Sequence, residues 1–141
     1  MRVLLDTNVI VSAVTTRGLC ADVFRGVLSD HDLLTCQKIL YDVCRVLRSK
    51  FSVPAELVSE YLELLFHDTL IAAPKGAPVI SIKDRDDVEI VAAAIAAGAQ
   101  VLVTGDAELQ RLRLVQGVSI LSPRAFWEKL KVRQGHAPDD R

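Results

Sequence analysis

The sequence predicts an α/β fold built on a parallel sheet, in a single domain. Residues 3–5 and residues 101–103 are short, wholly apolar runs, as expected of strands buried on both faces of a parallel sheet. Each run leads to an acidic residue, and residues suited to a turn or a helix start stand around that acid. A chain of 141 residues that is 50% hydrophobic is long enough to bury a real core.

Carboxylates therefore mark the ends of two predicted strands. Asp6 follows residues 3–5 directly, and Asn8 stands two positions further on, where apolar residues resume. Asp106 closes the second strand after the polar Thr104 and a glycine. Asp6 alone could be an ordinary helix N-cap, but the second junction repeats the same plan. In open α/β sheets ligands bind at this edge, outside the carboxyl ends of the strands.

Composition limits the classes of protein that remain possible. No apolar run reaches the roughly 18 residues that a membrane span needs, and no signal-peptide pattern opens the chain, so we expect a cytoplasmic protein with no membrane partner. Cys20, Cys36 and Cys44 lack metal-site spacing and should be reduced thiols in apolar segments. A net charge of −1 gives no global attraction to nucleic acid, so such binding would need a local basic patch.

Between and beyond these strands the chain alternates predicted helices with short strands. In order, we expect a helix over residues 20–28, a strand over 32–35 and a second helix over 37–50. A third helix should begin at Pro54, and a proline-containing loop should follow over residues 71–82. The loop should lead into a short or edge strand at residues 79–80. A last strand at residues 118–122 should precede a helix over residues 123–132.

Asp42 occupies an unusual place on the helix predicted over residues 37–50. It lies three residues after Ile39 and four before Val46, at the edge of the apolar stripe and partly aimed at the interior. Lys38 falls mostly away from that stripe. A solvated boundary position explains Asp42 equally well, so this segment alone does not decide its role.

Asp87 is harder to explain as a surface residue. Asp86 and Glu89 resemble a capping box at the start of a helix that runs to Ala97. At 100° per residue Asp87 shares a stripe with Val91, so it points into the buried face of that helix. A buried charge is costly unless it is paired or coordinates a metal, and this segment offers no cation on the same face. We therefore expect a functional carboxylate at this position.

Four carboxylates thus share a predicted location: Asp6, Asp42, Asp87 and Asp106. Like charges placed together repel unless a cation lies between them. A set of oxygen ligands without His or Cys favours Mg²⁺ or Mn²⁺ over zinc. Such ions activate water and neutralise charge on a phosphodiester, so the predicted reaction is metal-assisted phosphodiester hydrolysis.

Four short motifs, taken in their order and spacing, resemble those of PIN-domain ribonucleases: Asp6-Thr7-Asn8, the Ile39 to Leu47 helical segment around Asp42, Asp84-Arg85-Asp86-Asp87 before an Ala-rich helix, and Val103-Thr104-Gly105-Asp106. The resemblance is strongest to the VapC-like toxin components of bacterial and archaeal toxin–antitoxin systems, and it spans Val3 to about Leu130. It implies a three-layer α/β/α sandwich with a central parallel sheet, covering residues 1–134. Residues 135–141 have little to pack and should form a disordered tail.

The same resemblance implies function, partners and site residues. It implies Mg²⁺- or Mn²⁺-dependent cleavage of RNA, a homodimer, and an antitoxin protein that blocks the site. Its acidic positions and supporting polar positions correspond here to Asp6, Asp42, Asp87 and Asp106, and to Asn8 and Thr104. The family usually has Glu where this chain has Asp42. The shorter side chain could place that carboxylate in water-mediated contact with the metal, whereas Asp6, Asp87 and Asp106 would bind it directly.

Other classes fit the sequence less well. A receiver-like phosphoacceptor would need a strand-end lysine after Asp106, and a haloacid-dehalogenase-type phosphatase would need Asp at the position of Asn8. A catalytically weak or inactive PIN-like scaffold that binds RNA or protein remains the alternative, and the departure at Asp42 favours it slightly. Apolar residues over 23–28 and 57–65 exceed what a small core needs, which also predicts a homodimer.

Overall fold

The predicted apolar runs form the centre of the sheet. The computed structural model describes residues 1–67, 69–72 and 84–135. Strand β1 (Arg2–Leu5) pairs in parallel with β4 (Val101–Val103) on one side and with β2 (Asp32–Cys36) on the other. Leu5 lies opposite Val103, so the residues that follow β1 and β4 leave the sheet side by side. The two apolar runs, predicted to be strands of a parallel sheet, are therefore parallel neighbours in it.

Three further strands complete a six-stranded sheet of order β3-β2-β1-β4-β6-β5. Strand β3 (Leu70–Ala72) is parallel to β2, and β6 (Val118–Leu121) is parallel to β4. Strand β5 (Leu114–Val115) pairs antiparallel with β6 at the edge. The sheet is therefore parallel at its centre and carries one antiparallel edge strand, which the sequence had not indicated.

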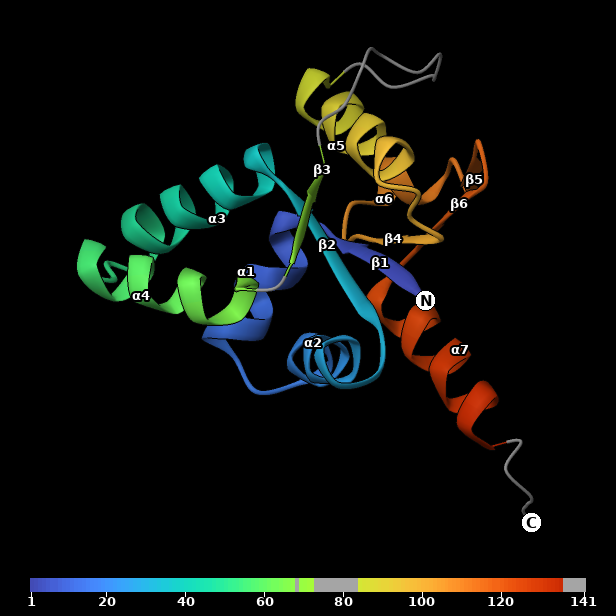
Figure 1. Ribbon diagram of the computed structural model, residues 1–141, viewed down its shortest axis with the longest axis horizontal. Coiled ribbons are helices and arrows are strands. Elements are labelled where there is room, and N and C mark those ends of the chain that lie inside the picture. The colour runs from blue at the N-terminus through green and yellow to red at the C-terminus, as the bar shows by residue number, and fades with distance from the viewer. Residues whose placement is uncertain (68, 73–83, 136–141) are drawn as a thin grey trace.

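Helices cover both faces of this sheet, as the predicted sandwich requires (Figure 1). Helices α1 (Thr7–Thr15) and α2 (Leu19–Asp30) lie on one face, where α7 (Pro123–Gly135) packs against α2. Helices α5 (Arg85–Ala96) and α6 (Ala107–Gln110) lie on the other, with α5 across β2, β3 and β4. From β1 to β3 the chain adds strands toward one side of the sheet, and from β3 to β4 and β6 it moves toward the other side. Because crossovers between parallel strands are right-handed, this reversal of direction places the later helices on the opposite face.

Helices α3 (Gln37–Lys50) and α4 (Ala55–Phe66) form an antiparallel pair that extends to one side of the sheet (Figure 1). Helix α3 contacts α1, α5 and β2, so its first turns stand near the carboxyl ends of the central strands. The core runs through the middle of the molecule, and Val3, Leu4 and Leu102 at its centre are fully buried. Burial on both faces explains why these strands show no polar alternation.

The structure differs from the sequence prediction around β3. This three-residue strand begins at Leu70, where the sequence had indicated the approach to a loop. The loop itself and the strand predicted at residues 79–80 lie outside the described residues. The short elements α6 and β5 were also not predicted, because four and two residues are too few for a periodic pattern to register.

The start of α5 also differs from the prediction. Its N-cap is Asp84, whose carboxylate accepts a hydrogen bond of 2.9 Å from the backbone N–H of Asp86, so the predicted capping box at Asp86 and Glu89 is wrong. Asp86 is instead in the first turn. The helix ends at Ala96, one residue before the predicted end, and Gly98 follows with φ of 69°, a left-handed conformation that favours glycine.

Two further expectations can be compared with the described residues. Cys20, Cys36 and Cys44 are free thiols, and burial raises the pKa of Cys36. None of the helices in the described ranges has both the length and the apolar character that crossing a bilayer requires. Residues 136–141 of the predicted tail lie outside those ranges, and α7 extends through Gly135.

Candidate active site

Asp6 stands where β1 ends and α1 begins. Its backbone N–H extends the sheet by donating to the carbonyl of Val103, at 2.9 Å. Its carboxylate is 4% exposed and accepts three hydrogen bonds, from the Thr7 backbone N–H at 2.7 Å, the Thr104 hydroxyl at 2.7 Å and the Asn8 amide at 3.3 Å. The same residue therefore caps the helix and presents a fixed carboxylate at the edge of the sheet.

Burial raises the pKa of the Asp6 carboxyl above its usual range. The hydrogen bonds from Thr104, Thr7 and Asn8 oppose that shift, and the negative charge of Asp106 adds to it. The balance is physically informative, because three donors alone would lower the pKa of a carboxylate. This group is held in an environment that disfavours its charge when no cation is present.

A small hydrogen-bond network ties the end of β4 to the start of α1. The backbone N–H of Asp106 donates to the Thr104 hydroxyl at 3.0 Å, and that of Gly105 donates to the Asn8 side-chain oxygen at 2.8 Å. A Cβ at Gly105 would lie 3.1 Å from this oxygen, so a larger residue would press the two segments apart. Asp106 also caps α6 by accepting from the Glu108 backbone N–H at 2.8 Å. Asn8 and Thr104 thus hold Asp6 and Asp106 in a fixed relation.

Asp87 lies in the first turn of α5 and is half-buried. Its pKa is raised to about 7, first by burial and then by the negative charges of Asp106, Asp84 and Asp6. A hydrogen bond with Asp106 raises it further. Asp6, the N-cap of α1, and Asp106, the N-cap of α6, therefore lie close enough to Asp87 to disfavour its charged form. Repulsion of this kind is expected when carboxylates share a site without a cation.

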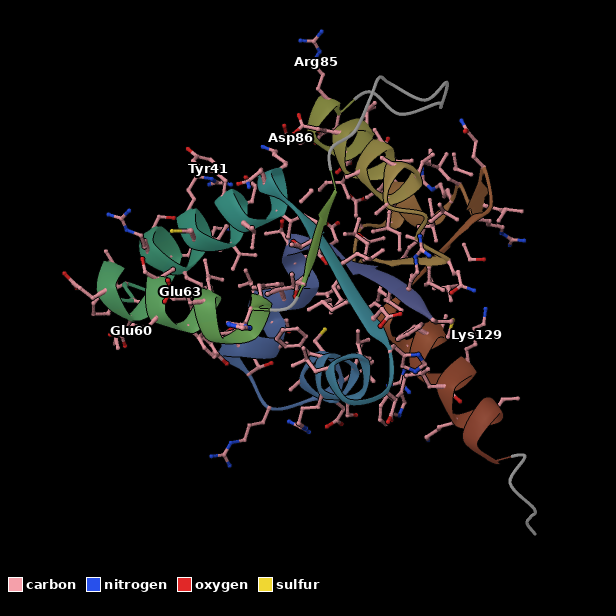
Figure 2. The ribbon with its side chains drawn as sticks, in the orientation of Figure 1. Tyr41, Glu60, Glu63, Arg85, Asp86 and Lys129 are labelled. Carbon is pink, nitrogen blue, oxygen red and sulfur yellow. The ribbon has the colours of Figure 1, made fainter. Side chains whose placement is uncertain are left out.

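Asp42 has a cationic partner that the sequence analysis missed. The Nζ of Lys38 lies 3.3 Å from an Asp42 carboxylate oxygen and 3.2 Å from one of Asp86, so this ammonium joins α3 to α5. Figure 2 shows Asp86 at the start of α5, above the first turn of α3. Burial would lower the pKa of Lys38, but its hydrogen bonds to Asp86 and Asp42 outweigh that effect and raise it.

Lys38 had been expected to face away from the apolar stripe, yet its side chain is only 20% exposed. The signal that could have identified it is the i,i+4 spacing to Asp42, which brings the two side chains together on a helix. Asp86 could not have been inferred in the same way, because it reaches Lys38 from a different helix. Asp42 itself is 8% exposed, and Arg45 approaches the same oxygen at 3.8 Å.

All four predicted acids line a single cleft of about 550 Å³. One end of the cleft is acidic and contains Asp6, Asp42, Asp84, Asp86, Asp87 and Asp106, together with Asn8. Its other end runs between α1 and α3 and is lined by Val11, Ser12, Thr15, Thr16, Val46, Lys50 and Phe51. The sequence analysis did not identify this second end, whose residues have no common motif. The cleft therefore has an acidic end and a mixed end that offers hydroxyls, an ammonium and an aromatic ring.

The acidic end has the chemistry, although not the closed geometry, of a site for a hard cation. In residues 1–67, 69–72 and 84–135, no three His, Cys, Asp or Glu side chains converge closely enough to form a ready-made metal site. No described Lys or Arg forms an ion pair with Asp6, Asp87 or Asp106, and the negative charge of Asp106 helps to raise the pKa of both Asp6 and Asp87. A divalent ion with oxygen ligands would relieve that repulsion. The donor set therefore fits Mg²⁺ or Mn²⁺, which would draw the carboxylates together.

Comparison with known proteins gives a consistent result at the level of the family. The sequence matches the PIN domain family over residues 2–108, a range that includes all four acids and both supporting polar residues. No curated protein matches the chain significantly.

The fold is similar to that of two solved structures. One is VapBC2 from Rickettsia felis bound to a DNA fragment from their promoter, with a TM-score of 0.60 and 16% identity over 86% of this chain and 98% of that one. The other is VapBC-1 from nontypeable Haemophilus influenzae, with a TM-score of 0.61 and 17% identity over 88% and 99%. At 16% and 17% identity, these comparisons show similarity of fold alone.

Proposed function

The chain belongs to the PIN domain family, and from that premise we propose that it is a Mg²⁺- or Mn²⁺-dependent endoribonuclease. The observation that carries the proposal is the convergence of four carboxylates, from β1, α3, α5 and the β4–α6 junction, on one cleft. Structural support alone does not explain this arrangement, because Asp6 and Asp106 both raise the cost of charging Asp87. A cation and an anionic substrate together explain why they are there.

Asp6, Asp87 and Asp106 would hold the ion. A divalent ion bound there would lower the pKa of a bound water and offset negative charge on the scissile phosphodiester. The protein's own residues hold these carboxylates in position. Three donors fix the Asp6 carboxylate, and the network through Asn8 and Thr104 keeps Asp106 beside it. Preorganised groups of this kind need little rearrangement during the reaction.

A direct assay separates this enzyme from a PIN-like scaffold that binds RNA without cutting it. The absence of a closed metal site among the described residues, and the pairing of Asp42 with Lys38, are what favour the scaffold. Purified protein should cleave a mixed single-stranded RNA when Mn²⁺ is added and should stop when EDTA is added. Binding of the RNA without cleavage at any Mn²⁺ concentration would identify the scaffold instead.

We propose that the mixed end of the cleft holds the nucleotide next to the scissile phosphodiester. Phe51 is 47% exposed at the end of α3, and Lys50 precedes it. An exposed ring can stack on a base, and an ammonium beside it can contact a phosphate. This end lies on the same cleft as the acids, so one RNA strand can occupy both.

Replacing Phe51 with Ala should raise the KM for RNA about 5- to 150-fold, since stacking on an aromatic ring contributes roughly 1–3 kcal/mol per base. The kcat should change little, because Phe51 is remote from the acids. Tyr41→Ala is the matched control. Tyr41 is 65% exposed on the outer side of α3 (Figure 2), outside the cleft, and its loss should leave KM unchanged. Steady-state kinetics that show equal KM values for wild type and Phe51→Ala would exclude this path.

We also propose that the chain is the toxin of a toxin–antitoxin pair, acting in the cytoplasm on RNA. The fold similarity to the two VapBC structures supports this proposal. An antitoxin protein that occupies the cleft would exclude RNA and hold the nuclease inactive. Co-expression with the product of an adjacent small gene should suppress cleavage, if that gene encodes the partner.

The homodimer remains a proposal. Of the residues predicted to be surplus to the core on α2, Val23 and Phe24 are buried inside the chain, whereas Leu28 is 44% exposed. On α4, Leu57 is 55% exposed and Tyr61 is 38% exposed. These two side chains lie one helical turn apart and could form the centre of a symmetric contact.

Light scattering at micromolar concentration should give the mass of a dimer for the wild-type chain and of a monomer for Leu57→Glu. A charge buried against a second copy would be unpaired, which costs several kcal/mol. Leu114→Glu is the control, because Leu114 is 63% exposed on the edge strand β5. A wild-type chain that stays monomeric across this range would rule the dimer out.

A further inference from the structure

We propose that Lys38 takes the place of a second cation, so that this site binds one divalent ion and not two. The inference rests on the proposed function, because it concerns how the metal site of that function is charged. It assigns a role to a residue that neither the motifs nor the family match singles out. In this role Lys38 is a positioning residue, which acts through the two carboxylates that it holds.

The geometry of Lys38 carries the inference. Its Nζ lies 3.3 Å from Asp42 and 3.2 Å from Asp86, and these two acids belong to different helices, α3 and α5. The Lys38 side chain is 20% exposed and that of Asp42 is 12% exposed, whereas that of Asp86 is 63% exposed. The ammonium therefore bridges a mostly buried carboxylate on one helix and an exposed carboxylate on another.

This contact divides the acids of the cleft into two sets. Asp42 and Asp86 share the Lys38 ammonium. Asp6, Asp87 and Asp106 have no ion pair with any described Lys or Arg, and they repel one another. The first set already has the positive charge it needs, and the second does not. An external cation therefore has a reason to bind at the second set only.

A second divalent ion at Asp42 would have to displace Lys38 or stand next to it. Standing next to it is unfavourable, because the dication and the ammonium repel at short range in a partly buried site. Displacing it would break its contacts with both Asp42 and Asp86, which join α3 to α5. Removing Lys38 reverses both effects, since it vacates the position and leaves two carboxylates uncompensated. The lysine thus sets the number of ions.

The test is the number of Mn²⁺ ions bound per chain, measured by isothermal titration calorimetry and by the loss of the free Mn²⁺ signal in electron paramagnetic resonance. Wild type should bind one ion, Lys38→Met two, and Lys38→Arg one. Arg45→Met is the matched control, because Arg45 is on the same helix and 3.8 Å from the same Asp42 oxygen but is 55% exposed. It should bind one ion. Adding Asp42→Asn to Lys38→Met should restore a single ion, because it removes the buried one of the two carboxylates that Lys38 contacts.

Two results would overturn the inference alone: a wild-type chain that binds two ions, or a folded Lys38→Met chain that cleaves RNA and still binds one. The wild-type count does not depend on any variant being folded, so it keeps the inference testable if Lys38→Met is unstable. A wild-type chain that binds no Mn²⁺ and cuts no RNA would instead overturn the proposed function and the inference with it. Binding and cleavage measured on the same samples therefore distinguish the two failures.

Discussion

Replacing Asp6 with Asn should abolish RNA cleavage, with a loss of at least about 1000-fold, or about 4 kcal/mol of transition-state stabilisation. Asn has nearly the same shape, and its oxygen can still accept from the Thr7 N–H that now lies 2.7 Å from the carboxylate. The other atom becomes an NH₂ group facing the donors of Thr104 and Asn8. The variant therefore keeps its cap, loses its charge and presents donors where the cation would need an acceptor.

Stability should respond differently from activity. In EDTA, Asp6→Asn should be no more stable than wild type, because the buried NH₂ that faces the donors of Thr104 and Asn8 offsets the removal of a carboxylate that burial disfavours. In Mn²⁺ at 100 times its Kd, wild type should gain about 2.7 kcal/mol, and the variant should gain little. Thermal unfolding with EDTA and with Mn²⁺ measures both quantities.

Asp32→Asn is the control for this variant. It removes the same charge from an exposed position at the start of β2, at the opposite edge of the sheet. Its unfolding in Mn²⁺ and its cleavage of RNA should match wild type. Normal cleavage by Asp6→Asn would refute the assignment of Asp6 to the site.

Replacing Asp87 with Asn should reduce cleavage about 100- to 1000-fold and should also change how stability depends on pH. The folded-state pKa of Asp87 is about 7, whereas the unfolded value is near 3.8. Between these values the folded protein binds more protons than the unfolded chain, so metal-free stability should fall as pH rises from about 4 to about 7. Because Asn does not titrate in this range, the metal-free stability of Asp87→Asn should decline less steeply with pH.

The measurement is thermal unfolding in EDTA across that pH range. Asp87→Asn should unfold a few degrees higher than wild type at pH 8, and close to wild type at pH 4 to 5. Some decline should persist, because burial also raises the pKa of Asp6. Glu89→Gln, an exposed change on the same helix, should retain the wild-type profile. Identical pH profiles for wild type and Asp87→Asn would contradict the proposed coupling of Asp87 to its acidic neighbours.

The sequence predicted the central part of the fold because that part depends on local patterns. Residues 3–5 and 101–103 could be recognised as buried strands from their apolar runs. Parallel strands end at the same edge of a sheet, so the proximity of Asp6 and Asp106 followed from that assignment. The inward direction of Asp87 followed from helical periodicity, and the structure places it in the same cleft.

The features that the sequence did not predict depend on contacts between distant segments. Asp84 and Asp86 are both suitable N-caps by residue type, and in the structure Asp84 occupies that position. Asp86 is consequently free to meet Lys38, on another helix. The apolar face of α2 was interpreted as surplus to the core, but α7 packs against α2. No pattern within either segment indicates that the two helices meet.

Analysis of the product ends of cleaved RNA tests the central claim most directly. If a metal-activated water attacks the phosphodiester, the fragments should form in Mn²⁺, should not form in EDTA, and should carry no 2′,3′-cyclic phosphate. A nuclease that uses the 2′-hydroxyl of RNA as its nucleophile needs no metal and leaves that cyclic end. Cyclic phosphates in the products, or wild-type cleavage that continues in EDTA, would contradict a carboxylate-bound metal as the basis of activity.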